Sequence, residues 1–203
     1  MSSKLDKSVI VAGAGLVASI FTMLVKKVRE AGGNDEDIHR LATPDGETLL
    51  GKMADLVVSS KRQVFKILVD FRKTLQEAIQ AGKYDWVNSD ITQDHFPVQG
   101  GVQKEVEAVL FHFNRIVTSD QAISEMEKQG FRPATIEELL ALGASYPELQ
   151  KQFPILALGS VWRHPSGSLY VPYLAWRGCG RDLHLHWLGH VWGGHCRFVA
   201  LRK

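Results

Sequence analysis

The sequence predicts an α+β protein in which a helical N-terminal extension precedes a mixed domain. Residues 1–60 follow the three- and four-residue spacing of helices. Residues 61–150 alternate between strand-like and helix-like segments, and residues 153–202 hold short alternating runs separated by glycine-rich turns. Segregated helices and strands are typical of α+β domains. We therefore expect an extension at 1–60 and a domain at 61–203.

The extension is predicted to contain three helices. The first is long and ends at Gly32 and Gly33, because glycine is common just after the last turn of a helix. A short helix is expected at about Asp37–Leu41. The turn Thr43–Gly46 then precedes a third helix, from about Glu47 to Ser59.

The elements of the domain are predicted from β-branched and aromatic runs and from helix start and stop signals. Thr135 and Glu138 have the spacing of a capping box, which opens a helix that ends at Gly143. The other two helices are expected at Thr74–Ala81, stopped by Gly82, and at Ser119–Gln129, closed by Gly130. The predicted strands are Val64–Phe71, Lys104–Phe113, Ile155–Trp162, Leu169–Trp176, Asp182–Trp187 and Cys196–Arg202.

Composition argues against a nucleic-acid partner and against a disulfide scaffold. The formal net charge is only +2, and no run of lysine and arginine interleaved with aromatic residues occurs, so we expect no nucleic-acid partner. Cys179 and Cys196 are the only cysteines, too few for a disulfide scaffold and compatible with a reducing compartment.

The first helix contains an uncharged run, Val9–Val25, of seventeen residues. A membrane span needs about 20 apolar residues, so this run is at the short limit. One face of the helix carries small or polar residues, namely Ser8, Ala12, Gly15, Ser19, Thr22 and Lys26. We expect a buried helix or one that forms a homo-oligomer in a cytoplasmic protein, and the alternative is a membrane anchor through Val9–Val25.

The same helix begins with a glycine pattern that suggests a cofactor site. Val9–Ala18 resembles the turn at which glycines let a pyrophosphate approach a helix N-terminus. That site requires a following hydrophobic strand that ends in an acidic residue. Here the polar turn Asn34–Asp37 follows instead. We therefore expect no cofactor.

The C-terminal segment has an unusual composition. Phe153–Arg202 holds four of the five tryptophans and five of the eight histidines, but no lysine, glutamate or glutamine. Within Asp182–Trp187, large apolar residues alternate with small or polar ones, which is typical of a strand with one buried face. The residues at the intervening positions fit no single chemistry. The pattern indicates a fixed frame that displays a changeable surface.

Three stretches resemble the C-type lectin fold. They are Gly130–Leu140, Ile155–Trp162 and the closing segment with Trp187, Trp192 and Cys196–Ala200. Within that fold, residues 61–203 resemble the variable proteins of diversity-generating retroelements, whose fold is shared with formylglycine-generating enzymes. The resemblance implies that a reverse transcriptase copies a template with errors at adenines and replaces the 3′ end of the gene. AAC codons then become NNC codons, and the varied side chains face solvent.

The resemblance implies a diversified region at 175–195. NNC codons never encode Lys, Glu, Gln, Met or Trp, and none of these occurs at the thirteen positions we expect to vary. These ligand-binding positions are Arg177, Gly178, Cys179, Gly180, Asp182, His184, His186, Gly189, His190, Val191, Gly193, Gly194 and His195. The expected scaffold of the site is Trp176, Trp187, Trp192, Cys196, Arg197 and Phe198. Replacement of Trp187 or Trp192 by alanine should lower the free energy of unfolding as much as the loss of a buried indole does.

Other interpretations of these residues lead to different chemistry. His184, His186, His190 and His195, with the two cysteines, suggest zinc, but no paired metal-ligand motif frames them and second-shell carboxylates are nearly absent. We expect Arg181 to bind a backbone carbonyl or a carboxylate, and Tyr84–Ile91 to form a loop held by turn hydrogen bonds.

The sequence thus predicts a non-enzymatic protein that binds an unknown protein or other macromolecule, with no metal. The alternatives are a metal-dependent enzyme of the formylglycine-generating type and a membrane-anchored interaction module.

Overall fold

A computed structural model gives the structure of the chain. Contacts between residues divide the chain into two units, Met1–Ser60 and Lys61–Lys203. The structure describes residues 7–59, 63–98, 100–178 and 180–203, with the backbone alone described at 7–14, 55, 56, 58 and 59. It contains helices and a large mixed sheet, so the predicted α+β class is confirmed.

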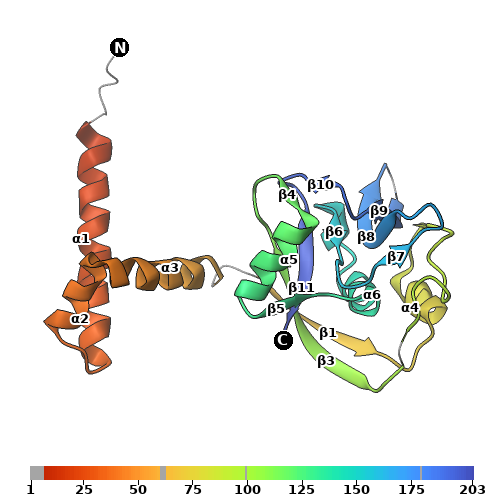
Figure 1. Ribbon diagram of the computed structural model, residues 1–203, viewed down its shortest axis with the longest axis horizontal. Coiled ribbons are helices and arrows are strands. Elements are labelled where there is room, and N and C mark those ends of the chain that lie inside the picture. Colours follow the sequence, from red (N-terminus) through yellow and green to blue (C-terminus); the bar gives the residue numbers. More distant parts are fainter. Residues whose placement is uncertain (1–6, 60–62, 99, 179) are drawn as a thin grey trace, which may run out of the picture. The chain divides into compact units, whose positions relative to one another are not determined.

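The first unit is helical, as predicted. Its helices are α1 Lys7–Glu30, α2 Asp35–His39, the short 3-10 helix η1 Arg40–Ala42, and α3 Pro44–Ser59 (Figure 1). The third helix begins three residues earlier than predicted. Proline suits the first position of a helix because the amide that it lacks has no partner there. Gly46 is fixed by packing, since a Cβ would lie 2.3 Å from the carbonyl oxygen of Leu41.

The first helix exposes apolar side chains along its middle. Their exposed fractions run from 51% at Ile20 to 67% at Val17. The hydroxyl groups of Ser19 and Thr22 donate to carbonyl groups one turn earlier in the helix, at 3.0 and 2.9 Å. The exposed apolar residues are Leu16, Val17, Ile20, Phe21 and Met23. In the part of the chain that the structure describes, no helix combines enough length and apolar character to cross a membrane.

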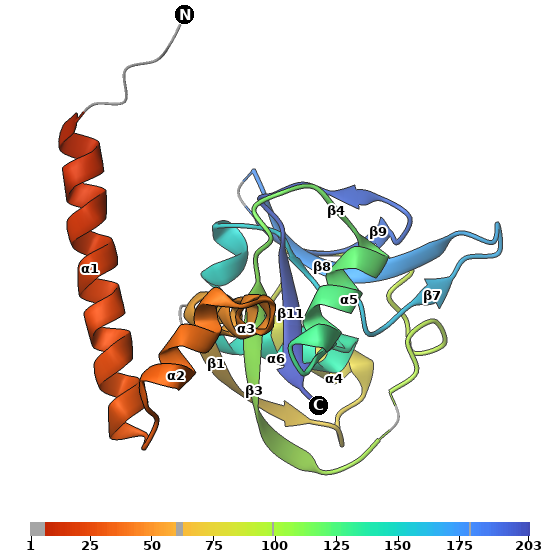
Figure 2. The ribbon, with the colours of Figure 1, turned by 60° about the vertical axis from the view of Figure 1, so that its left-hand side comes forward.

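The second unit is built on one mixed sheet with a small two-stranded sheet beside it (Figures 1 and 2). The strand order of the main sheet is β1-β3-β11-β6-β8-β9-β2, and β5 and β7 add to β11 and β8. The pairs β11–β6 and β2–β9 are parallel and the others antiparallel. The strands are β1 Val64–Asp70, β2 Trp86–Val87, β3 Gln103–Phe111, β4 Val117–Thr118, β5 Phe131–Pro133, β6 Ile155–Leu156, β7 Trp162–Arg163, β8 Leu169–Arg177, β9 Gly180–Trp187, β10 Val191–Trp192 and β11 Arg197–Arg202.

Hydrophobic cores lie on both faces of the sheet. Successive side chains of a strand point to opposite faces. In β11, Val199 belongs to one core while Phe198 and Ala200 belong to the other. Helices α4 and α6 pack into the first core and α5 into the second. The helices of this unit are α4 Leu75–Gly82, α5 Ser119–Lys128 and α6 Ile136–Ser145, with the 3-10 helix η2 Leu149–Lys151.

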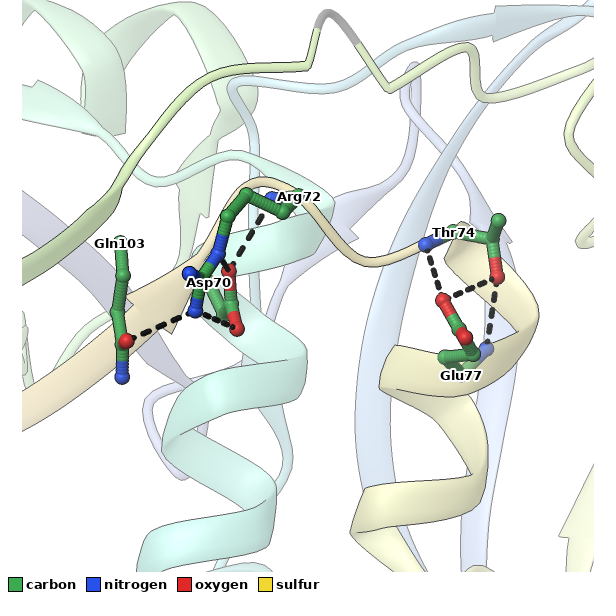
Figure 3. Close-up of polar contacts among 5 residues, drawn as sticks. All are labelled: Asp70, Arg72, Thr74, Glu77 and Gln103. Carbon is green, nitrogen blue, oxygen red and sulfur yellow. Dashed lines mark hydrogen bonds and ion pairs between the residues drawn. The ribbon is translucent and has the colours of Figure 1, made fainter.

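Local hydrogen bonds fix the connection from β1 to α4 (Figure 3). The Arg72 guanidinium donates to both oxygens of Asp70, at 2.7 and 2.8 Å, and to Gln103 Oε1 at 2.9 Å. This contact lowers the pKa of Asp70 to about 2. One turn later Thr74 and Glu77 form a capping box, in which the Glu77 carboxylate accepts from the Thr74 amide at 2.8 Å. Both features stop the strand and start the helix within a few residues.

Two predicted boundaries are wrong for the same reason, which is close backbone packing. The expected strand Ile155–Trp162 is broken into β6 and β7. Gly159 turns the chain there: its amide donates to the carbonyl of Ala134 at 2.9 Å, and a Cβ at Gly159 would lie 2.6 Å from that oxygen. Helix α6 passes through Gly143 to Ser145, because this glycine makes room for Tyr84, whose Oη would lie 2.2 Å from a Cβ.

A chain that begins at Ser60 is expected to fold. Both cores draw their described residues from Phe65 onward. The Tm of this shortened chain should lie within about 4 °C of the Tm of the corresponding transition in the full chain. For a domain of this size, that shift corresponds to a change of about 1 kcal/mol in the free energy of unfolding. Circular dichroism and calorimetry measure this. A shortened chain that shows no cooperative transition would mean that residues 1–60 complete the core.

Candidate functional site

The candidate site is built on the long hairpin of β8 and β9. Eight residue pairs join the strands, from Tyr170 opposite Trp187 to Arg177 opposite Gly180. The hairpin turns at Gly178, whose φ of 65° is in the left-handed region that glycine adopts freely. Residues directly opposite each other share a face of the sheet. The hairpin therefore presents one set of side chains to the core with α4 and α6, and the other set to the opposite face.

Arg181 anchors the core side of the hairpin. Its guanidinium donates to the backbone carbonyl of Gly82 in α4, to that of Gly143 in α6 at 2.6 Å, and to Gln150 Oε1 at 3.2 Å. The guanidinium carbon lies 5.0 Å from the centre of the Tyr84 ring. The sequence-based expectation that Arg181 binds a backbone carbonyl is confirmed. One side chain thus ties β9 to two helices.

The loop before β2 is held to the same strand. Asp85 Oδ2 accepts from the Arg181 amide at 2.7 Å, and Asn88 Oδ1 accepts from the Asp90 amide at 2.9 Å. Asn88 makes the predicted turn hydrogen bond, whereas Asp85 binds an amide of β9 and not a turn amide. The bond to Asp85 lies beside the parallel pair of β2 and β9, in which Trp86 is opposite Asp182. The sheet edge beside β9 is thereby closed by an aromatic residue.

Aromatic rings form a continuous row on the opposite face of the hairpin. We call this set the ring row. The rings of Trp86 and His184 are 4.1 Å apart, and His186 lies 4.5 Å from His190 and 4.9 Å from Trp192, between ring centres. Tyr173 links the two halves, at 5.7 Å from each of the two strand histidines. The ring row consists of Trp86, His184, Tyr173, His186, His190 and Trp192.

A pocket of about 200 Å³ opens at one end of the ring row. The Trp192 indole forms its buried wall, and donates from Nε1 to Ser119 Oγ at 2.9 Å. Arg197 fixes the last loop, because its Nη1 donates to the carbonyl groups of His195 and Cys196 at 3.1 and 3.2 Å. The pocket is lined by Pro154, Leu156, Tyr173, His186, His190, Trp192, Gly193, His195 and Cys196.

The surroundings of His184 and His186 favour the neutral form of both rings. Burial lowers the pKa of both His184 and His186, and the positive charge of Arg177 acts in the same direction. Arg177 donates to Tyr173 Oη at 2.7 Å and stands 4.0 Å from the carboxylate of Asp182. The carboxylate of Asp182 therefore already has a cation beside it.

Ten of the predicted variable residues are exposed or half-buried, and they lie on the β8–β9 hairpin and in the segment from Gly189 to His195 around β10. Among those described, the exposed residues are Arg177, Gly178, Gly189, His190, Val191 and His195. The half-buried ones are His184, His186, Gly193 and Gly194. Cys179 lies outside the described residues.

Two predicted variable residues are buried, so the expectation that they face solvent is wrong. Gly180 packs against the loop before β2, where a Cβ would lie 3.1 Å from the Cβ of Asp85. Asp182 is 8% exposed, because Trp86 is its strand partner and Arg177 covers its carboxylate. Both residues lie where the short strand β2 covers the hairpin edge.

The predicted scaffold is correct only in part. Trp192, Cys196 and Phe198 are buried, and Arg197 is half-buried. By contrast, Trp176 and Trp187 are exposed, at 38% and 51%. Trp187 stands at the end of the hairpin beyond the core, and its indole lies on the turn at Gly189, where a Cβ would be 2.6 Å from the ring. Trp176 lies under the ammonium group of Lys151, which is 5.1 Å from its ring.

The sequence-based prediction missed Trp86 and Tyr173. Trp86 is 96 positions from Asp182 in the chain, and no local pattern links the two. The place of Tyr173 could have been predicted in part from the sequence. It alternates with Val171 and Ala175 along its strand, so it lies on the same face as these two residues. Its pairing with His184 depends on the hairpin register, which the position of the turn sets.

The histidines of the described residues do not form a metal centre. Within the described ranges, no three His, Cys, Asp or Glu side chains are grouped in a way that could hold a metal ion. His195 Nε2 contacts Cys196 Sγ at 3.8 Å, and burial raises the pKa of this thiol. The buried cysteine is therefore protonated at neutral pH and a weak nucleophile.

Comparisons with family models, curated proteins and solved structures give no match. The resemblance to C-type lectins and to retroelement variable proteins therefore stays a prediction from the sequence.

Trp192→Ala is expected to lower the free energy of unfolding by about 3–5 kcal/mol, because the buried indole leaves a cavity. Trp187→Ala should cost about 1 kcal/mol or less, since half of that side chain faces solvent already. Denaturant unfolding of the two variants measures the difference. Equal losses would contradict the exposed position of Trp187.

Arg181→Ala is expected to cost about 3 kcal/mol, because it leaves carbonyl groups of two helices without their charged donor. Arg181→Lys should recover little of this, since an ammonium group cannot reproduce the fork of the guanidinium. The matched control is Arg177→Ala on the exposed end of the same hairpin, with a loss of about 1 kcal/mol or less. Similar losses for Arg181→Ala and the control would show that the anchor is unimportant.

Proposed function

We propose that this protein is a non-enzymatic ligand-binding protein, and that the ring row with the loops beside it forms the binding surface. The observation that carries the proposal is that ten predicted variable residues on the hairpin and around β10 are exposed or half-buried, and that three of them, His184, His186 and His190, belong to the ring row. A rigid element that presents many side chains which its own core does not require is suited to binding.

The composition of this surface supports recognition of a macromolecule. Tyr, Trp and Arg side chains are enriched at the energetic centres of protein interfaces. Trp86 of β2 and Arg177 of β8 are exposed on the face of the ring row, while Trp176 and Trp187 are exposed on the other face of the hairpin. A protein or another macromolecule is the expected ligand, and no basic surface for nucleic acid follows from the net charge of +2.

We further propose that the domain is lectin-like and that a diversity-generating retroelement varies its surface. The support is that the two faces of one strand have different surroundings. In β9, Leu183 is fully buried, whereas His184 and His186 stand on the other face among the rings. Mutation to NNC codons at the histidine positions changes that face and leaves the first core intact. Gly180 and Asp182 are the exceptions, and we expect less tolerance there.

The alternative of a formylglycine-type enzyme finds less support. Such chemistry uses a pair of cysteines, and Cys196 is buried with a raised thiol pKa. Neighbouring histidines are an allowed outcome of NNC codons. Binding without catalysis accounts for both residue types.

The first helix is proposed to associate with a second copy of the chain. Its five exposed apolar side chains span two turns and would be covered by such a contact. This supports a homo-oligomer in a cytoplasmic protein over a membrane-anchored module.

Sequencing of the DNA around the gene tests the origin of the surface. We expect a reverse-transcriptase gene and a near-copy of the 3′ end, with adenines at the codons of the exposed histidines. A locus with neither would remove the retroelement from the proposal and leave ligand binding to be judged alone.

Replacement of His184, His186, His190 and His195 together by Asn tests the displayed surface. The free energy of unfolding is expected to change by about 2 kcal/mol or less in total, because substitutions at such positions cost about 0.5 kcal/mol each. The matched control is Leu183→Asn on the buried face of the same strand, which should cost more than the four together. A four-histidine variant that does not fold would refute the separation of surface and frame.

A further inference from the structure

We propose that the pocket at the end of the ring row binds a planar anionic group of the ligand, a carboxylate carried on or beside an aromatic ring. The inference rests on the proposed function, because it assigns the chemistry of one subsite on the binding surface. Its basis is the size of the pocket, the rings around it and the hydrogen-bond donors that line it.

The size and walls of the pocket suit a single ring. Pockets for whole small molecules have volumes of about 300–1,000 Å³. This pocket, at about 200 Å³, holds one group of a larger ligand. Three of its walls are the rings of His186, His190 and Trp192, and Leu156 and Pro154 add apolar surface. Aromatic rings pack favourably edge to face or offset against such walls.

The side chains that line the pocket suit an anion. None of the described residues that line it is acidic, and three are histidines, whose ring N–H groups can donate hydrogen bonds. The carboxylate of Asp182, on the same face of β9, is buried 4.0 Å from Arg177. When a histidine here takes up a proton, it has no counterion within the pocket, so a ligand carboxylate would supply one. The titratable or charged groups around His186 are Tyr173 and Arg177 of β8, Asp182 and His184 of β9, and His190, His195 and Cys196 of the loops that flank β10.

Binding of a carboxylate should therefore be linked to proton uptake. In the free protein, burial holds the pKa of His186 below its usual value, so this ring is neutral at pH 7. A bound carboxylate raises that pKa. Affinity then rises as the pH falls between the bound-state and free-state pKa values, by at most about tenfold per pH unit for one proton, and levels off below the free-state value. A neutral ligand shows no such rise.

The test uses three probes of nearly equal shape and different charge, which are benzoate, benzamide and benzamidine. Each is titrated into the full chain at pH 8, 7, 6 and 5.5, and the histidine ring signals are followed by NMR. We expect benzoate to bind most tightly, to bind more tightly at pH 6 than at pH 8, and to raise the pKa of His186. Benzamide should bind weakly without this pH dependence, and benzamidine should bind least.

Two variants assign the effect to the pocket. His186→Asn should abolish most of the pH dependence of benzoate binding, while the fold is checked by its unchanged backbone NMR spectrum. His164→Asn, a histidine outside the pocket, is the matched control and should leave benzoate binding unchanged.

Several results would overturn the proposal. They are equal binding of benzoate and benzamide across the pH range, tighter binding of benzamidine, no binding of benzoate at millimolar concentration, or a pH dependence that survives in His186→Asn. None of these bears on the DNA locus or on the stability of the four-histidine variant, so the subsite can be rejected while the displayed surface stands.

Discussion

The guanidinium of Arg181 is the contact on which the arrangement of the hairpin depends. It joins the end of α4, the interior of α6 and Gln150 to strand β9, and its backbone amide holds the loop of Asp85. Gly82 and Gly143 leave room for the Tyr84 ring beneath it, since a Cβ at either would lie within 2.3 Å of that residue. A charged, half-buried group with this many acceptors fixes position and orientation together. On the opposite face of β9, His184 and His186 are half-buried among the rings and take no part in the bonds of Arg181.

The exposure of that face varies along the strand, and the variation follows from where β2 lies. Near the turn, β2 and its loop cover the hairpin edge, so that Gly180 and Asp182 are enclosed although they alternate correctly for a displayed face. Further along, the second core provides the Trp192 wall, Leu188 of the loop after β9 packs against that core, and His190 lies against the Trp192 ring. Burial thus decreases along this face of β9, from Gly180 and Asp182, which are buried, to His184 and His186, which are half-buried. In the binding surface that we propose, the buried end is constant and the rest varies.

The sequence predicted what depends on local periodicity and on charge. The α+β class, most helices and strands of both units, and the anchoring role of Arg181 follow from spacing, caps and guanidinium chemistry. The burial of the tryptophans does not follow from these local signals. Trp187 and Trp192 have the same residue type and similar neighbours, but one lies past the end of the sheet and the other under α5, which only the tertiary arrangement decides. The same holds for Trp86, whose pairing with β9 bridges 96 positions of chain. Glycines needed for close packing, such as Gly143, were mistaken for helix ends because the two uses look alike in sequence.

The position of β11 has a consequence for synthesis of the protein. This strand lies in the interior of the sheet, paired with β3, β5 and β6, and it contributes to both cores. Emerging chains fold only with the residues that have already left the ribosome. The main sheet therefore cannot be completed until β11 has left the ribosome. Because β8 and β9 precede β11 in the chain, the whole hairpin has been synthesised before β3 and β6 can be joined through β11.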